Sequence, residues 1–191
     1  MNNKPEILAP AGSMERLIAA VRCGANAVYL GTKGINARRG ATNFTFEELK
    51  QAVEYCHARD VKIYLSLNIL ISDSERELAY KTVEAGLSLG VDAFIIQDLG
   101  LAKIIHSHFP TARMHASTQC SVNSPEGFKA LEKMGFVRAV LPREMSLDEI
   151  REIRQATDME LEMFVHGALC MCVSGQCYLS AMLGGRSGNR G

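Results

Sequence analysis

Short apolar segments alternate with longer amphipathic segments along the whole chain. Apolar residues return at helical spacing in the longer segments, as in Phe46, Leu49, Val53 and Cys56. The short segments have the length and composition of strands, and they are residues 6–10, 27–31, 62–68, 93–98, 113–118, 138–142 and 160–166. Strands that alternate with helices predict an α/β fold with a parallel sheet.

The ends of the expected helices carry recognisable capping residues. A Ser or Thr followed three residues later by Glu matches the capping box, in which each side chain bonds the backbone amide of the other residue. This pattern occurs at Thr45–Glu48, Ser72–Glu75 and Ser146–Glu149. Glycines are expected where helices end and strands resume, at Gly24, Gly90 and Gly135. These helix start and stop signals support the same alternation of strands and helices.

Two closures of a parallel sheet compete. A doubly wound open sheet would suit a glycine-rich phosphate turn after the first strand, but that turn reads APAGSM and lacks GxGxxG. A (β/α)8 barrel needs eight units, and about seven are found here. We therefore predict a (β/α)8 TIM-type barrel truncated after about seven βα units. Residues 1–180 would form a partial barrel domain, and residues 181–191 a Gly/Arg-rich tail leading into a missing remainder. The open barrel edge predicts self-association.

Polar and apolar side chains alternate in several of the expected strands. In a barrel the apolar set should face the helices, which turns the polar set towards the interior. We expect the polar set to converge at the C-terminal rim, where barrel enzymes hold their active sites. Its members are Asn68, Gln97, His115, Gln119, Arg143, Glu162 and His166. For any one of them, a polar layer that only fixes strand register is the alternative. Buried Glu162 needs a donor, and Arg143 or His115 is expected to supply it.

Composition and charge restrict the function classes. Apolar residues make up 47% and charged residues 22%, which is globular composition and excludes disorder. Twenty-one basic residues balance twenty-one acidic ones, so the whole surface carries no electrostatic footprint for nucleic acid. Neither a signal peptide nor an apolar run long enough for a membrane span is apparent, which predicts no membrane partner. Six cysteines then favour the reducing cytoplasm, where clustered thiols more often bind metal than form disulfides.

Three of the cysteines lie within HGALCMCVSGQC, residues 166–177, which leaves the last expected strand at the same rim. Thiolates at this spacing on a glycine-containing loop can surround one soft metal centre. A zinc site commonly uses two CxxC pairs, and that spacing is absent. An iron–sulfur cluster uses four cysteines, of which Cys170, Cys172 and Cys177 are close together. Cys120 could reach the rim, whereas Cys23 and Cys56 are expected to be buried thiols on helices.

The segment ELEMFVHGALCMCVSGQCYLS, residues 160–180, resembles the signature of peptidase family U32, the collagenase-like proteases. ILAPAGS, GANAVYLG, HASTQ, GFVRAVLPREMSLDEI and GGRSGNRG extend the resemblance over the chain. It implies a barrel domain that continues beyond residue 191 with further cysteines. It also implies kinship with oxygen-independent hydroxylases that carry a 4Fe–4S cluster. Some of these act on a pyrimidine base of tRNA or rRNA with prephenate, and others act in ubiquinone synthesis.

The resemblance assigns roles to two of the cysteines. Cys170 and Cys177 match the first two cluster ligands, whereas relatives commonly have alanine in place of Cys172. The 4Fe–4S cluster is therefore expected in the longer protein and not in this chain, with prephenate as a candidate cofactor. Without metal, the loop from Cys170 to Gly191 is expected to be mobile, because it has few apolar residues to bury.

Three functions stay open, in the order RNA hydroxylase, peptidase and binding module. The first uses both the cysteines and the polar interior. A peptidase needs an activated nucleophile, and neither GxSxG nor HExxH occurs, so its best version is a thiolate with His166 as base. We predict His166, Glu162 and His115 as catalytic residues, and Asn68, Gln97, Gln119 and Arg143 as substrate-binding residues. The expected substrate is RNA or a peptide.

Overall fold

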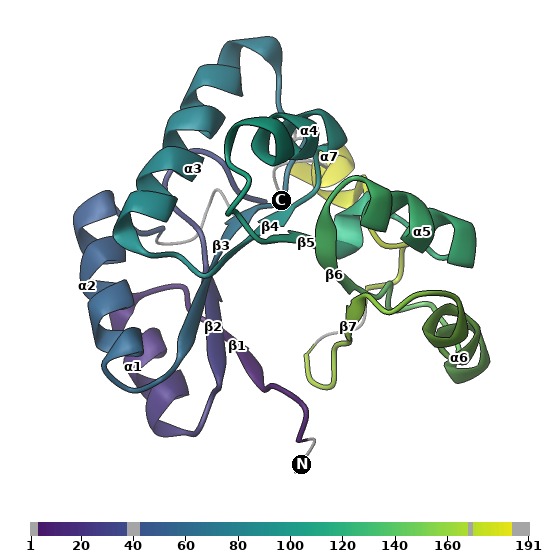
Figure 1. Ribbon diagram of the computed structural model, residues 1–191, viewed down its shortest axis with the longest axis horizontal. Helices are drawn as coiled ribbons and strands as arrows, with labels where there is room; N and C mark the ends of the chain where they lie inside the picture. Colours follow the sequence, from purple (N-terminus) through teal and green to yellow (C-terminus); the bar gives the residue numbers. More distant parts are fainter. Residues whose placement is uncertain (1–3, 38–42, 168–169, 185–191) are drawn as a thin grey trace.

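A curled parallel sheet of seven strands, in the order β1-β2-β3-β4-β5-β6-β7, is the centre of the molecule (Figure 1). The computed structural model describes residues 4–37, 43–167 and 170–184. The strands are β1 (Leu8–Pro10), β2 (Ala27–Leu30), β3 (Lys62–Leu67), β4 (Ala93–Ile96), β5 (Met114–Ala116), β6 (Phe136–Val140) and β7 (Glu160–Glu162). Because the first strand lies at an edge and each strand pairs with the next, the sheet is a half-barrel and not a doubly wound sheet. The predicted fold class is confirmed.

The helices that connect successive strands lie on the convex side of the sheet (Figure 1). They are α1 (Met14–Arg22), α2 (Phe46–His57), α3 (Arg76–Leu89), α4 (Leu99–His108), α5 (Pro125–Lys133) and α6 (Leu147–Ala156). The short helix α7 (Leu179–Gly184) follows β7, and 3-10 turns η1 (Asp73–Glu75) and η2 (Thr118–Cys120) precede α3 and follow β5. The capping boxes at Thr45 and Ser146 open α2 and α6 as predicted, and that at Ser72 opens η1. No helix in the described part of the chain is long and apolar enough to cross a membrane.

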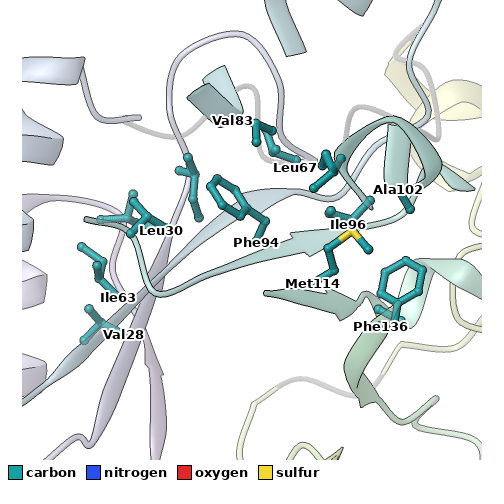
Figure 2. Close-up of a cluster of buried hydrophobic side chains, with 14 of the residues drawn as sticks. Val28, Leu30, Ile63, Leu67, Val83, Phe94, Ile96, Ala102, Met114 and Phe136 are labelled. Atoms are coloured by element: carbon teal, nitrogen blue, oxygen red, sulfur yellow. The ribbon is translucent and has the colours of Figure 1, made fainter. Parts of the chain in front are cut away.

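The main core lies between the sheet and its helices (Figure 2). Ile63, Leu65 and Leu67 of β3 point into it, as the alternation predicted. Gly86 lets α3 approach β4 closely, because a Cβ there would lie 2.9 Å from the ring of Phe94. The other face of the sheet holds a much smaller apolar cluster, formed by Ala27, Tyr64, Ala93 and Ile95 with Leu8 and Tyr29 beside it. The interior of the half-barrel is therefore left largely to polar side chains.

The last strand is shorter than predicted. We expected residues 160–166, but β7 ends at Glu162, after a final bond from the Leu141 amide to the Glu162 carbonyl at 2.8 Å. The predicted alternation therefore stops at Glu162. The expected loop after Cys170 also contains α7, while residues 185–191 of the predicted tail lie outside the described residues.

Candidate functional site

A cavity of about 440 Å³ opens at the carboxyl ends of the strands. Its walls come from the segments that follow β1, β2, β3, β5 and β6, and from the end of β7. The polar side chains in the wall include Arg16, Asn68, Ser117, Gln119, Arg143 and Glu162, and the apolar ones include Tyr29, Ile95, Val140 and Phe164. The cavity is thus at the rim where the sequence predicted a site. Its size suits a small organic ligand or one nucleotide base.

The structure brings Asn68, Gln119, Arg143 and Glu162 of the predicted set to this cavity. Gln97, His115 and His166 are not in its wall. The Gln97 side-chain amide donates to the backbone carbonyl of Gln119 at 3.2 Å. His115 is buried beneath the cavity, with its ring edge-on to Tyr64 at a centroid distance of 4.7 Å.

His166 is exposed and lines a separate pocket of about 200 Å³ beside β6 and α6. It does so because β7 ended four residues earlier, so strand alternation no longer directs its side chain. The two pockets share Arg143 and Phe164. The Arg143 guanidinium lies over the Phe164 ring, 4.0 Å from its centroid, at the boundary between the two pockets. This contact holds the cation at the rim.

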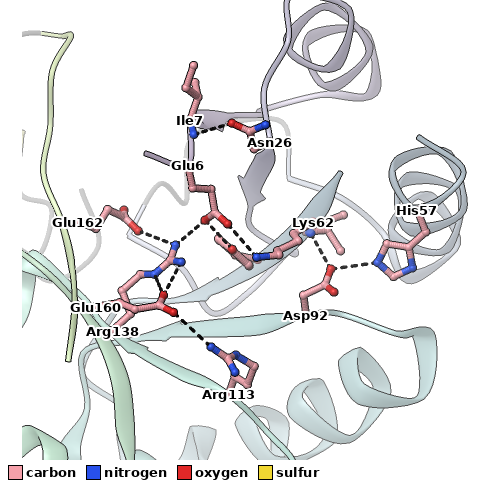
Figure 3. A network of polar contacts seen from close by, with 12 residues as sticks. Glu6, Ile7, Asn26, His57, Lys62, Asp92, Arg113, Arg138, Glu160 and Glu162 are labelled. Atoms are coloured by element: carbon pink, nitrogen blue, oxygen red, sulfur yellow. Dashed lines mark hydrogen bonds and ion pairs between the residues drawn. The ribbon is translucent and has the colours of Figure 1, made fainter. Parts of the chain in front are cut away.

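An ion-pair network beneath the cavity connects the two edges of the sheet (Figure 3). Arg138 of β6 donates to Glu6, before β1, at 2.6 Å, and to Glu160 of β7 at 2.6 and 2.8 Å. Its Nη1 also lies 3.5 Å from Glu162, so the expectation of Arg143 or His115 as the partner of Glu162 was wrong. Glu6 further accepts from Lys62 and from Tyr64, at 2.9 and 2.7 Å.

This network sets the protonation of the buried groups. Burial raises the pKa of Glu6, but hydrogen bonds from Arg138, Lys62 and Tyr64 outweigh it and lower the value to about 2. Burial lowers the pKa of His115 to about 3, helped by the charge of Arg138, so His115 is neutral. Burial also raises the pKa of Glu162, and Arg138 opposes this only in part. Glu162 is thus a carboxyl group in the cavity wall that takes up a proton more readily than an exposed one.

Sequence reasoning missed two arginines of this region. Arg138 was placed at the start of a strand, but β6 begins at Phe136 and has Arg138 in its middle. The β-forming pair Phe136 and Val137 could have extended the strand and revealed a charge within it. Arg16 lies in the first turns of α1 and lines the cavity. The APAGS turn that precedes Arg16 contains no motif that would have indicated a binding residue.

The three clustered thiols lie together beyond the rim. Cys172 hydrogen-bonds with Cys177 and with Cys170, and these bonds raise the pKa of Cys172. The backbone amide of Leu179 donates to Cys177 and lowers its pKa. No set of three or more His, Cys, Asp or Glu side chains within the described residues is arranged to hold a metal ion. The donor type nonetheless fits an iron–sulfur cluster, for which cysteine thiolates are the usual ligands.

The other cysteines do not join this group. The Cys120 thiol points inward and donates to the carbonyls of Ile96 and Gln97 at 3.4 and 3.5 Å. Burial raises its pKa to about 12, which makes it a poor thiolate donor. Cys56 is buried in the helix layer as predicted, whereas Cys23 is exposed at the end of α1 and not buried.

Comparison with known proteins defines the class. Residues 12–191 match the model of peptidase family U32, and the chain belongs to this family. It is 41% identical over 190 residues to the 23S rRNA 5-hydroxycytidine C2501 synthase of Escherichia coli strain K12, covering 100% of this chain and 28% of that protein. It is 38% identical to tRNA hydroxylation protein P of the same organism, covering 98% and 42%.

Other relatives carry protease names. The chain is 37% identical to a collagenase of Porphyromonas gingivalis, covering 99% of this chain and 48% of that protein. The solved structure of the U32 peptidase Mk0906 superimposes with a TM-score of 0.72 at 15% identity, covering 85% of this chain and 69% of that one. This likeness shows the shared fold. The chain spans between 28% and 48% of the length of these curated relatives.

Proposed function

We propose that the chain is the barrel part of an iron–sulfur enzyme that hydroxylates a pyrimidine base of tRNA or rRNA in the cytoplasm. The observation that carries this proposal is the junction between the thiol loop and the cavity. The amide of Arg143, a cavity residue, donates to the Ser174 hydroxyl between Cys172 and Cys177. A redox centre on these thiols would therefore adjoin the substrate. The RNA hydroxylation named for the relatives supports the same reaction.

The cavity residues divide the work of binding. Asn68 and Gln119 offer amide donors and acceptors for the edge of a base turned out of its stack. Arg16 and Arg143 suit a phosphate of the RNA or the carboxylates of prephenate. Glu162, whose pKa burial raises, is the cavity residue suited to take up and release a proton. Because the chain has no net charge, most of the attraction for RNA would have to come from the rest of the longer protein.

Cys170 and Cys177 would hold the 4Fe–4S cluster together with cysteines of the longer protein. When bound, such a cluster supplies single electrons to a neighbouring substrate. Cys172 lies between the two ligands and would hydrogen-bond to the centre without ligating it.

The peptidase alternative has less support from the geometry. Its best version pairs a thiolate with His166 as base, but none of the described cysteines lines the pocket to which His166 belongs. His166 also faces the smaller pocket, which is lined largely by apolar side chains such as Met145 and Ile150. The binding-module alternative leaves the thiols without a role.

Deletion of the gene for the longer protein tests the proposal. Nucleosides from tRNA and rRNA are separated and their masses are measured by mass spectrometry. In the deletion strain, a pyrimidine nucleoside that carries one additional oxygen atom should be absent. The wild-type gene should restore it, Arg143→Met and Cys177→Ala should not, and Arg151→Met, an exposed arginine of α6, is the matched control. Unchanged nucleosides in the deletion strain, with collagen cleavage by the purified protein, would favour the peptidase.

A further inference from the structure

The loop between the clustered thiols is anchored through a single buried residue. Ser174 is 9% exposed. Its neighbours Met171 and Val173 are 97% and 55% exposed, so the loop gains little from apolar burial. Something other than packing must hold this segment at the rim.

Hydrogen bonds to Glu144 supply that anchor. The Ser174 amide donates to one carboxylate oxygen of Glu144 at 3.0 Å, and the Ser174 hydroxyl donates to the other at 2.9 Å. The Arg143 amide donates to the same hydroxyl at 3.4 Å. Partial burial raises the pKa of Glu144, but these bonds from Ser174 and the charge of Arg143 outweigh it, so Glu144 is a carboxylate at neutral pH.

A second contact fixes the other side of the loop. The Ser121 hydroxyl, just after η2, donates to the backbone carbonyl of Ser174 at 2.6 Å. It also accepts a hydrogen bond from the side-chain amide of Gln176 at 3.3 Å. Gly175 makes this approach feasible, because a Cβ there would lie 2.5 Å from the Ser121 oxygen and 2.7 Å from the Gln119 carbonyl. Gly175 also has a φ of +80°, which favours glycine.

We propose that Glu144 and Ser121 form a clamp that grips Ser174 and so positions the Cys172 and Cys177 thiols beside the cavity. The clamp residues come from the segments after β6 and β5, which also carry the cavity residues Arg143 and Gln119. The distance between the thiols and the substrate is thereby set by the barrel and not by the loop. The two clamp residues and the serine that they hold are positioning residues, because none of them is in the cavity wall. The assignment of a role in a cluster rests on the proposed function, but the clamp itself does not.

Hydrogen–deuterium exchange of the peptide spanning residues 171–178 tests the clamp in the metal-free, full-length protein. Glu144→Ala removes both acceptors for Ser174 and should speed exchange in this peptide roughly tenfold or more, given the strength of hydrogen bonds to charged groups. Glu144→Gln keeps one acceptor oxygen and should give an intermediate rate. Gly175→Ala should match Glu144→Ala. Gly24→Ala is the control, since Gly24 has a similar φ of +91° and a Cβ added there would meet no atom within 4 Å.

Release of iron to a chelator from the anaerobically purified protein gives the second measurement. We expect faster release and an altered reduction potential in Glu144→Ala and Gly175→Ala, with wild-type values in Gly24→Ala. If exchange in the 171–178 peptide is unchanged by Glu144→Ala, the clamp does not exist. If exchange rises but the iron-loaded protein keeps its release rate and potential, the clamp holds the loop without positioning the thiols, and the proposal is overturned. A protein without iron would refute the proposed function alone, because the exchange result would still decide the clamp.

Discussion

Replacing Arg138 with methionine removes the cation at the centre of the network beneath the cavity. Arg138 is 11% exposed, and its partners Glu6 and Glu162 are 21% and 19% exposed. Breaking a buried pair costs about 3–5 kcal/mol, because the remaining carboxylates lose their partner in a poorly solvated place. Glu160 is 52% exposed and should add little. We therefore expect Arg138→Met to lower the free energy of unfolding at pH 7 by about 3–5 kcal/mol, a large share of the total for a domain.

Urea unfolding followed by circular dichroism measures this loss. Adding Glu6→Gln to Arg138→Met should recover part of it, because one unpaired carboxylate is removed. Arg151→Met is the matched control, since Arg151 pairs with Asp148 at 68% and 86% exposure. An exposed pair of this kind contributes about 0–1 kcal/mol. Equal losses in Arg138→Met and Arg151→Met would refute the role of burial in the network.

Three further outcomes follow from the described contacts. The folded pKa values of His115 and Glu6, about 3 and about 2, lie below their ordinary values of 6.5 and 4.5. The melting temperature should therefore fall as the pH drops from 6.5 to 3 and from 4.5 to 2, and His115→Gln should flatten the first of these two intervals. A melting temperature that does not change with pH in the wild type would contradict both shifts. Gly86→Ala should lose about 1–3 kcal/mol in urea unfolding through overpacking against Phe94, although alanine favours helices; a gain in stability would disprove the close contact. In a thiol titration of the metal-free chain, four thiols should react rapidly and two slowly, and the slow ones are Cys56 and Cys120; rapid reaction of all six would exclude this burial.

Much of the fold could be predicted because its determinants are local. The capping box of Thr45 and Glu48 closes within one helical turn, so its sequence pattern is sufficient to locate the start of α2. The alternation in β3 placed Ile63, Leu65 and Leu67 on the helix side, because a central strand keeps its period when both neighbours pair with it. Once seven such units are placed, the barrel rim and four of its polar residues follow.

The remaining part of the site depends on contacts between distant residues. His166 missed the cavity because β7 is an edge strand with β6 as its described partner, and the ladder between them stops before Pro142. Arg138 reaches Glu6 across 132 positions of the chain, which no periodicity in the sequence can indicate. The anchoring of Ser174 by Glu144 likewise joins two loops that only the curled sheet brings together.

The proposed redox function depends on one claim, that the thiols of Cys170 and Cys177 hold an iron–sulfur cluster. Iron and acid-labile sulfide in the full-length protein, purified without oxygen, test it most directly. We predict about four irons and four sulfides per wild-type chain, loss of both in Cys170→Ala and Cys177→Ala, and retention in Cys172→Ala and in the control Cys120→Ala. A wild-type protein free of iron, or a Cys177→Ala variant with full iron content, would contradict the account.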